Sequence, residues 1–149
     1  MRGRAMGTND ECLVASHRGK VLKAGWELPK LADLSAVVTD YRIEAALALI
    51  RTNLGGVSAS AIASHLGLSR SRFEHLFKAE TGTTFRAYLR QMRLSTALRL
   101  LVNSRLRVKE ISAQCGYAST SNLSREFKRE FGVTPSEYRH STSRQQIAH

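Results

Sequence analysis

The sequence has little of what stabilises a secreted or membrane protein. Its two cysteines, Cys12 and Cys115, lie far apart and form no CxxC pair, so neither a disulfide framework nor a zinc finger is supported. No apolar run approaches the roughly 18 to 20 residues that span a bilayer, and residues 1–7 lack the apolar core of a signal peptide. We therefore expect a cytoplasmic protein in a reducing compartment, with no membrane contact.

Motifs that carry catalysis are also missing. The chain contains no Gly-rich phosphate-binding loop, no HExxH, no GxSxG and no paired carboxylates in an apolar setting. Its histidines and cysteines do not have the spacing of metal ligands, so we predict no metal and no cofactor. The sequence predicts a protein without catalytic residues.

Positive charge is abundant. Among 149 residues there are 23 Lys and Arg against 12 Asp and Glu, which gives a formal net charge of +11, and 17 of the cations are Arg. A planar guanidinium suits phosphates and guanine edges better than a point charge does. Nucleic acid is therefore the leading partner.

Apolar periodicity predicts an all-α fold. Only Pro29 and Pro135 occur, which leaves the chain between them free of the commonest helix breaker. Apolar residues recur at helical spacing within 39–54, 57–66, 73–77, 84–103, 108–115 and 123–131, and most of these stretches end at glycine. Ser69 can cap the third stretch. A helix that follows a cap at Thr83 or Thr84 and runs to about Asn103 would be about 28 Å long at 1.5 Å per residue. Thr134, Pro135 and Glu137 form a capping signal for a final short helix.

An internal repeat divides the chain into two similar units. The string Phe77-Lys78-x-Glu80-x-Gly82-x-Thr84-x-x-x-Tyr88 recurs 50 residues later as Phe127-Lys128-x-Glu130-x-Gly132-x-Thr134-x-x-x-Tyr138. Upstream, Ile62 and Gly67 match Ile111 and Gly116 at an offset of 49, so the second turn is one residue longer. We expect a flexible N-terminal segment of unknown role at 1–38; unit 1 at 39–82; a linker helix at 83–104; unit 2 at 105–140; and a C-terminal tail at 141–149.

Each unit has the pattern of a helix-turn-helix, whose second helix packs on the first and turns its outer face to the major groove. On a helical wheel Phe73 and Phe77 face inward, as do Leu123 and Phe127 in unit 2. The opposite face of each second helix then carries polar groups followed by a lysine, Ser71, Glu74, His75 and Lys78 in unit 1 and Ser121, Ser124, Arg125 and Lys128 in unit 2.

From about Tyr41 to Arg139 the sequence resembles the DNA-binding region of the AraC/XylS family of bacterial transcription regulators. The most specific part is Ile111-x-x-x-Cys115-Gly116-Tyr117 followed by Phe127-Lys128-x-x-Phe131-Gly132-Val133-Thr134-Pro135-Ser136-x-Tyr138-Arg139. The resemblance implies two helix-turn-helix subdomains joined by a long linker helix, which read successive major-groove segments of double-stranded DNA. A bridge of about 28 Å would place the two recognition helices about one DNA turn apart, so we expect one monomer to suffice for a bipartite site. We also expect RNA polymerase as a partner and a nucleoid-associated location. The 38 N-terminal residues are too few for the sugar-binding domain that many members carry, so we expect a stand-alone member or a fragment.

Carried over by position, the resemblance implies base-reading roles for Ser71, Arg72, Glu74, His75, Ser121, Asn122, Ser124 and Arg125. Phosphate contacts would come from Lys78 and Lys128. Each role has an ordinary alternative: Arg125 and His75 as solvated surface groups, Glu74 at the edge of the interface, and the lysines lying over their own helices. Four arginines of the linker helix are most simply a solvated stripe, although one or two could reach backbone phosphates: Arg86, Arg90, Arg93 and Arg99. The alternative function is a basic architectural DNA- or RNA-binding protein without sequence specificity.

Overall fold

The computed structural model describes residues 39–147, and the predictions made for residues 1–38 and 148–149 lie outside that part. Within it the chain forms helices and no strand, which confirms the all-α prediction. The helices are α2 (Tyr41–Thr52), α3 (Ala59–His65), α4 (Arg70–Thr81), α5 (Phe85–Asn103), α6 (Val108–Gln114), α7 (Thr120–Phe131) and α8 (Pro135–Ile147).

The second helices of the two units, α4 and α7, begin and end in the same way. The Ser69 hydroxyl accepts a hydrogen bond from the Arg72 amide, and the Ser119 hydroxyl accepts one from the Asn122 amide, each at 3.2 Å. Such caps satisfy amides that have no partner inside the helix. Both helices end at a left-handed glycine, Gly82 or Gly132. Local sequence therefore defines both helices.

The turns that precede α4 and α7 differ by one inserted residue. In unit 1 the Leu68 amide donates to the Ala63 carbonyl at 2.8 Å, and in unit 2 the Tyr117 amide donates to the Ser112 carbonyl at 3.0 Å. Leu68 is followed directly by the capping serine, whereas Ala118 stands between Tyr117 and Ser119. Ala118 is thus the extra residue that the shifted repeat predicted.

The last helix, α8, starts as predicted and is longer than predicted. The Thr134 amide donates to Glu137 Oε2 at 2.8 Å, and the Glu137 amide donates to Thr134 Oγ1 at 3.3 Å, which is a capping box. The helix then continues to Ile147, through most of the segment 141–149 assigned to a tail. No glycine or proline interrupts it, so no local signal ends it earlier.

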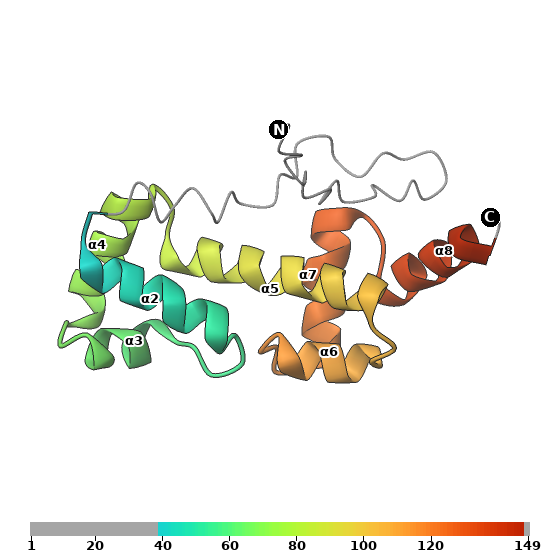
Figure 1. The fold of residues 1–149 in the computed structure, drawn as a ribbon, viewed down its shortest axis with the longest axis horizontal. Coiled ribbons are helices and arrows are strands. Elements are labelled where there is room, and N and C mark those ends of the chain that lie inside the picture. Colours follow the sequence, from blue (N-terminus) through green and yellow to red (C-terminus); the bar gives the residue numbers. More distant parts are fainter. Residues whose placement is uncertain (1–38, 148–149) are drawn as a thin grey trace, which may run out of the picture.

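One hydrophobic cluster supports each unit, and α5 contributes to both. Phe85, Tyr88, Leu89 and Met92 of α5 belong to the cluster of unit 1. From Leu94 onward the buried apolar residues of α5 belong to the cluster of unit 2, and Leu101 is the last of them. In Figure 1, α4 lies beside the N-terminal end of α5 and α7 crosses its C-terminal half. This helix is therefore a structural part of each unit as well as the connection between them.

Cys115 is fully buried in the cluster of unit 2. Burial raises the pKa of its thiol to about 11, which keeps it protonated at neutral pH. Cys115 therefore packs as a small buried hydrophobic residue.

Candidate nucleic-acid interface

The outer faces of α4 and α7 carry the predicted site residues. Phe73 and Phe77 in α4, and Leu123 and Phe127 in α7, are fully buried, so they fix which side of each helix faces solvent. Eight of the ten predicted residues are exposed, and Glu74 and Ser124 are half-buried. The structure therefore confirms the predicted division of each helix into an inner and an outer face.

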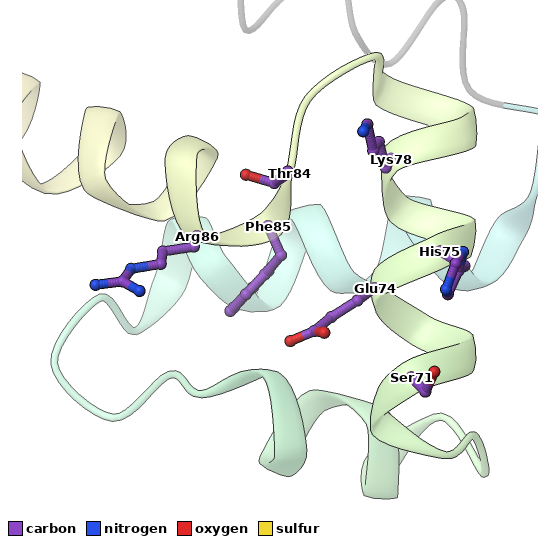
Figure 2. A pocket seen from close by; sticks show the side chains of 7 residues that line it. All are labelled: Ser71, Glu74, His75, Lys78, Thr84, Phe85 and Arg86. Carbon is purple, nitrogen blue, oxygen red and sulfur yellow. The ribbon is translucent and has the colours of Figure 1, made fainter.

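On α4, four predicted residues line one open hollow of about 400 Å³. Ser71, Glu74, His75 and Lys78 line it together with Thr84, Phe85 and Arg86 from the start of α5. Figure 2 shows these residues, with Glu74 pointing from α4 toward the side on which Phe85 and Arg86 lie. The α4 surface thus offers hydroxyl, imidazole, carboxylate and ammonium groups to one ligand.

Glu74 is paired within its own helix. Arg70 Nε lies 3.0 Å from Glu74 Oε1, one helical turn earlier, and the two side chains are 67% and 43% exposed. An exposed pair of this kind contributes little to stability. It does place a positive charge next to the carboxylate, which reduces the repulsion between Glu74 and phosphates.

On α7, Asn122 and Arg125 line a second hollow of about 550 Å³. The long helix α5 contributes Arg86, Arg90 and Arg93 to its wall, and Arg129 adds a further cation from α7. Within this hollow five arginines surround a single carboxylate, that of Glu126. The second hollow is therefore strongly attractive to a polyanion.

Arg86 lines both hollows, so the outer faces of α4 and α7 open to the same side of α5. Arg86 had been predicted to belong to a solvated stripe, and no role had been predicted for Arg129. Arg129 had a detectable signal, because it follows Arg125 by one helical turn on an exposed face. No sequence pattern could have placed Arg86 between the hollows, since its position there depends on how α4 and α5 pack.

Two other arginines of α5 make contacts inside the protein, and their assignment to a solvated stripe was wrong. Arg90 Nη2 lies 2.9 Å from Glu130 Oε2, and Arg90 Nε lies 3.6 Å from Glu126 Oε2. Arg93 Nη2 donates to the Leu54 carbonyl at 3.2 Å. Their partners lie about 40 residues away along the chain or on another helix, where helical periodicity carries no information.

The remaining predicted residues are on the outer faces but outside the two hollows. Ser121, Ser124 and Lys128 belong to α7, and Arg72 belongs to α4. Arg72 lies close enough to Asp40 for its charge to lower the pKa of that carboxyl, although hydrogen bonds from Arg42 lower it more. Arg72 therefore lies near Asp40, at the start of α2.

Tyr117 stands at the edge of the second hollow and contacts α7. Its hydroxyl donates to Glu126 Oε2 at 3.1 Å. Burial, followed by the neighbouring Glu126 carboxylate, raises the pKa of Tyr117, so the hydroxyl remains a donor. The Arg93 guanidinium carbon lies 5.9 Å from the centre of the Tyr117 ring.

Within residues 39–147, no group of three or more His, Cys, Asp and Glu side chains is placed to hold a metal ion. Over the same range, no helix has both the length and the apolar character needed to cross a membrane.

Two capped helices with exposed polar faces, each the second helix of a helix-turn-helix, define a DNA-binding protein of the double helix-turn-helix class. A family model described as a helix-turn-helix domain matches residues 62–141. The chain belongs to the AraC/XylS-type family of helix-turn-helix proteins.

Known proteins agree with this assignment. The xylose operon regulatory protein of Escherichia coli K12 is 35% identical over 103 residues, which is 68% of this chain and 26% of that protein. The chain thus spans about a quarter of the length of this relative. This relative is an operon regulatory protein, which agrees with the predicted class of transcription regulator.

Solved structures share the fold. A transcriptional regulator with an AraC-type DNA-binding domain from Chromobacterium violaceum is 30% identical, with a TM-score of 0.60 over 69% of this chain and 93% of that one. The DNA-binding domain of the transcriptional factor AdpA, solved in complex with a target DNA, is 26% identical, with a TM-score of 0.59 over 78% of this chain and 96% of that one.

Proposed function

We propose that this protein is a sequence-specific transcription regulator that inserts α4 and α7 into successive major-groove segments of double-stranded DNA. The observation that carries the proposal is the pair of outer faces, which open to the same side of α5 and share Arg86. A helix of 19 residues spans about 28 Å, close to the roughly 34 Å of one DNA turn. One monomer then suffices for a bipartite site.

Base reading falls mainly to α7. Arg125 can make a bidentate contact to the O6 and N7 atoms of guanine, and Asn122 can do the same at the N6 and N7 atoms of adenine. Both side chains are exposed and line the same hollow. On α4, Ser71, Arg72, Glu74 and His75 occupy the corresponding outer face and are proposed as readers of the other half-site.

Phosphate contacts come from exposed cations around these readers. Lys78 and Lys128 occupy the same repeat position on α4 and α7. Arg86 and Arg129 add cations on the walls of the hollows. Such contacts increase affinity for every DNA sequence, because they neutralise phosphates without touching base edges. RNA polymerase, in the nucleoid of a bacterial cytoplasm, is the further partner that this role requires.

Selection of bound duplexes from a random DNA pool tests the proposal. We expect enrichment of two conserved half-sites within roughly two helical turns, bound at 1:1 stoichiometry. An enriched pool with no sequence preference would contradict the proposal. It would favour the alternative of an architectural protein, for which specific and random duplexes compete equally at every salt concentration.

Inserting about five base pairs between the half-sites tests the arrangement on one side of the duplex. Half a turn of DNA moves the second half-site to the opposite side, so tight binding should be lost. An insertion of about ten base pairs, which restores the side but increases the distance, is the matched control. Unchanged affinity for the five-base-pair insertion would contradict simultaneous insertion of both helices.

The proposed phosphate contact of Lys128 predicts a uniform effect. Lys128→Ala should weaken binding to cognate and random duplexes by similar factors, and should reduce the slope of log affinity against log salt by about 0.9. A loss confined to the cognate duplex would make Lys128 a base reader.

A further inference from the structure

The two units meet at a second place besides the continuous helix α5. Arg93 stands between Met92, the last buried α5 residue of the unit 1 cluster, and Leu94, the first of the unit 2 cluster. Its Nη2 donates to the Leu54 carbonyl, in the turn after α2, at 3.2 Å. Its guanidinium carbon lies 5.9 Å from the centre of the Tyr117 ring, in the turn before α7. One side chain thus contacts a turn of each unit.

The backbones of these two turns also touch. Gly116 has a φ of +80°, and a Cβ built on it would lie 2.3 Å from the Leu54 carbonyl oxygen and 2.9 Å from Gly55 Cα. Any side chain at this position would push the turns apart. Arg93, Tyr117, Gly116 and the Leu54–Gly55 turn form what we call the inter-unit joint.

An ion-pair network continues the joint into α7. The Tyr117 hydroxyl donates to Glu126 Oε2 at 3.1 Å, and Arg90 lies between Glu126 and Glu130 at 3.6 and 2.9 Å. Arg90 and the two glutamates are each about one third exposed, so water screens these pairs only in part. The orientation of α7 relative to α5 is therefore held by three charged side chains and one hydroxyl.

A continuous helix alone is a weak constraint on orientation. Long helices bend, and a small bend in the middle of α5 would turn one outer face relative to the other. The joint adds contacts away from the α5 axis, and these resist bending because the Leu54 carbonyl would lose its donor. On a bipartite site, relative orientation decides how many base pairs separate the half-sites.

We propose that Arg93 is a positioning residue that sets the preferred spacing of the two half-sites by holding unit 1 and unit 2 in one relative orientation. This inference rests on the proposed function, because it assumes that both outer faces bind one duplex. Arg93 contacts no base in this proposal. It acts through the Leu54 carbonyl and the Tyr117 ring.

The first experiment measures affinity of the full chain for the selected site and for versions with one or two base pairs added or removed between the half-sites. Wild type should lose affinity sharply at each altered spacing. Arg93→Ala should reduce the ratio between the affinity for the best spacing and the affinity for an altered spacing by about five- to tenfold. Arg93→Lys, which keeps a cation and a donor, should restore part of the ratio. Arg99→Ala, which removes an exposed arginine from the same helix, should leave it unchanged.

A second measurement reports the joint without DNA. Spin labels on cysteines introduced at the exposed positions His65 of α3 and Lys109 of α6, in a Cys12→Ser background, give the distance distribution between the units. We expect a narrow distribution in wild type and Arg99→Ala, and a broad one in Arg93→Ala. Tyr117→Leu, which removes the ring and its hydroxyl, should broaden it as well and replaces Arg93→Ala if that variant does not fold.

The outcomes separate this inference from the proposed function. If wild type shows no half-sites or no spacing preference, the proposed function fails, whatever the label distances. If wild type prefers one spacing and Arg93→Ala and Tyr117→Leu keep both that preference and a narrow distribution, the positioning role of Arg93 is wrong.

Discussion

Unit 1 and unit 2 share the repeated residues but use one of them in different ways. Glu80 in unit 1 accepts hydrogen bonds from the Thr39 amide and hydroxyl at 2.8 and 3.0 Å, which ties the start of the unit to the end of α4. Glu130, at the same repeat position, binds Arg90 of α5 instead. The same carboxylate position near the end of the second helix thus binds the segment before α2 in unit 1 and the helix α5 in unit 2.

The hydrophobic clusters of the two units also differ in the residues that surround the repeated phenylalanine. In unit 1, Phe77 packs against the rings of Phe73, Phe85 and Tyr88 at centroid distances of 5.7, 5.7 and 5.5 Å. In unit 2, Phe127 packs against Phe131 and Tyr138 at 4.4 and 5.8 Å. Leu123 and Pro135 occupy the positions of Phe73 and Phe85. Both units therefore keep the buried phenylalanine and tyrosine of the repeat, whereas the residues packed around them differ.

The largest expected effect comes from removing the central ring of each unit. Phe77→Ala and Phe127→Ala should each lower the free energy of unfolding by about 3 to 5 kcal/mol, because both rings are fully buried. We expect the larger loss at Phe77, which has three aromatic neighbours against two. Urea unfolding followed by circular dichroism measures the loss.

Amide exchange shows where that stability is lost. Because α5 contributes to both clusters, either substitution should also reduce protection in α5. Full protection of α5 and of the other unit would show that the units are energetically independent. Phe77→Leu and Phe127→Leu, which keep most of the apolar volume, are the controls.

The next largest effect concerns base reading, where α4 and α7 differ most. Arg125→Ala should reduce discrimination at one or two base pairs of one half-site by roughly 1 to 3 kcal/mol. His75→Ala, at the equivalent position of α4, should cost less, because an imidazole makes no bidentate contact to guanine. Affinities for all single-base substitutions of the selected site measure both effects.

Arg125→Lys is the control for charge, since it keeps the cation but loses the bidentate geometry. An Arg125→Ala profile identical to wild type would remove Arg125 from the readers. A larger loss at His75 than at Arg125 would reverse the proposed order of the two units.

A smaller, pH-dependent effect on thermal stability is expected from removing the Glu80 charge. Hydrogen bonds from the Thr39 amide and hydroxyl and from the Asp40 amide lower the pKa of Glu80 below its ordinary value of 4.5. A folded-state pKa below the unfolded one stabilises the protein above the unfolded pKa, and this stabilisation is lost as the pH falls through the folded pKa. Glu80→Gln should therefore lower Tm at neutral pH, and the difference from wild type should shrink below about pH 4.5.

Thermal unfolding across this pH range measures the difference. Glu44→Gln, an exposed carboxylate in the first turn of α2, is the control for a general loss of negative charge. A Tm difference for Glu80→Gln that is constant with pH would contradict the role of the Glu80 charge.

The smallest expected effect is at Glu74. Removing its charge should raise affinity for non-cognate DNA, since a carboxylate repels phosphates. The Arg70 pair at 3.0 Å already offsets part of that repulsion, so we expect an increase of less than about fivefold. Glu74→Gln measured on random duplexes tests this, with Arg70→Ala as the partner substitution. Weaker non-cognate binding of Glu74→Gln would contradict the repulsion argument.

Several elements were predictable because their causes are local. The Ser69 and Ser119 caps, the left-handed Gly82 and Gly132, and the burial of Phe77 follow from residues within one or two helical turns. The exposed faces of α4 and α7 follow from the same periodicity. The length of α8 was underestimated, since nothing in the local sequence marks its end.

The sequence by itself determined two similar helical units, their caps, their buried faces and the outward position of the candidate readers, because each depends on neighbours within a few residues. Only the tertiary structure decided that Arg90 pairs with Glu130 of α7, that Arg93 donates to the Leu54 carbonyl and that Arg86 lines both hollows. It also decided that Gly116 must remain glycine. These features depend on packing between different helices and turns, and helical periodicity does not report which segments meet.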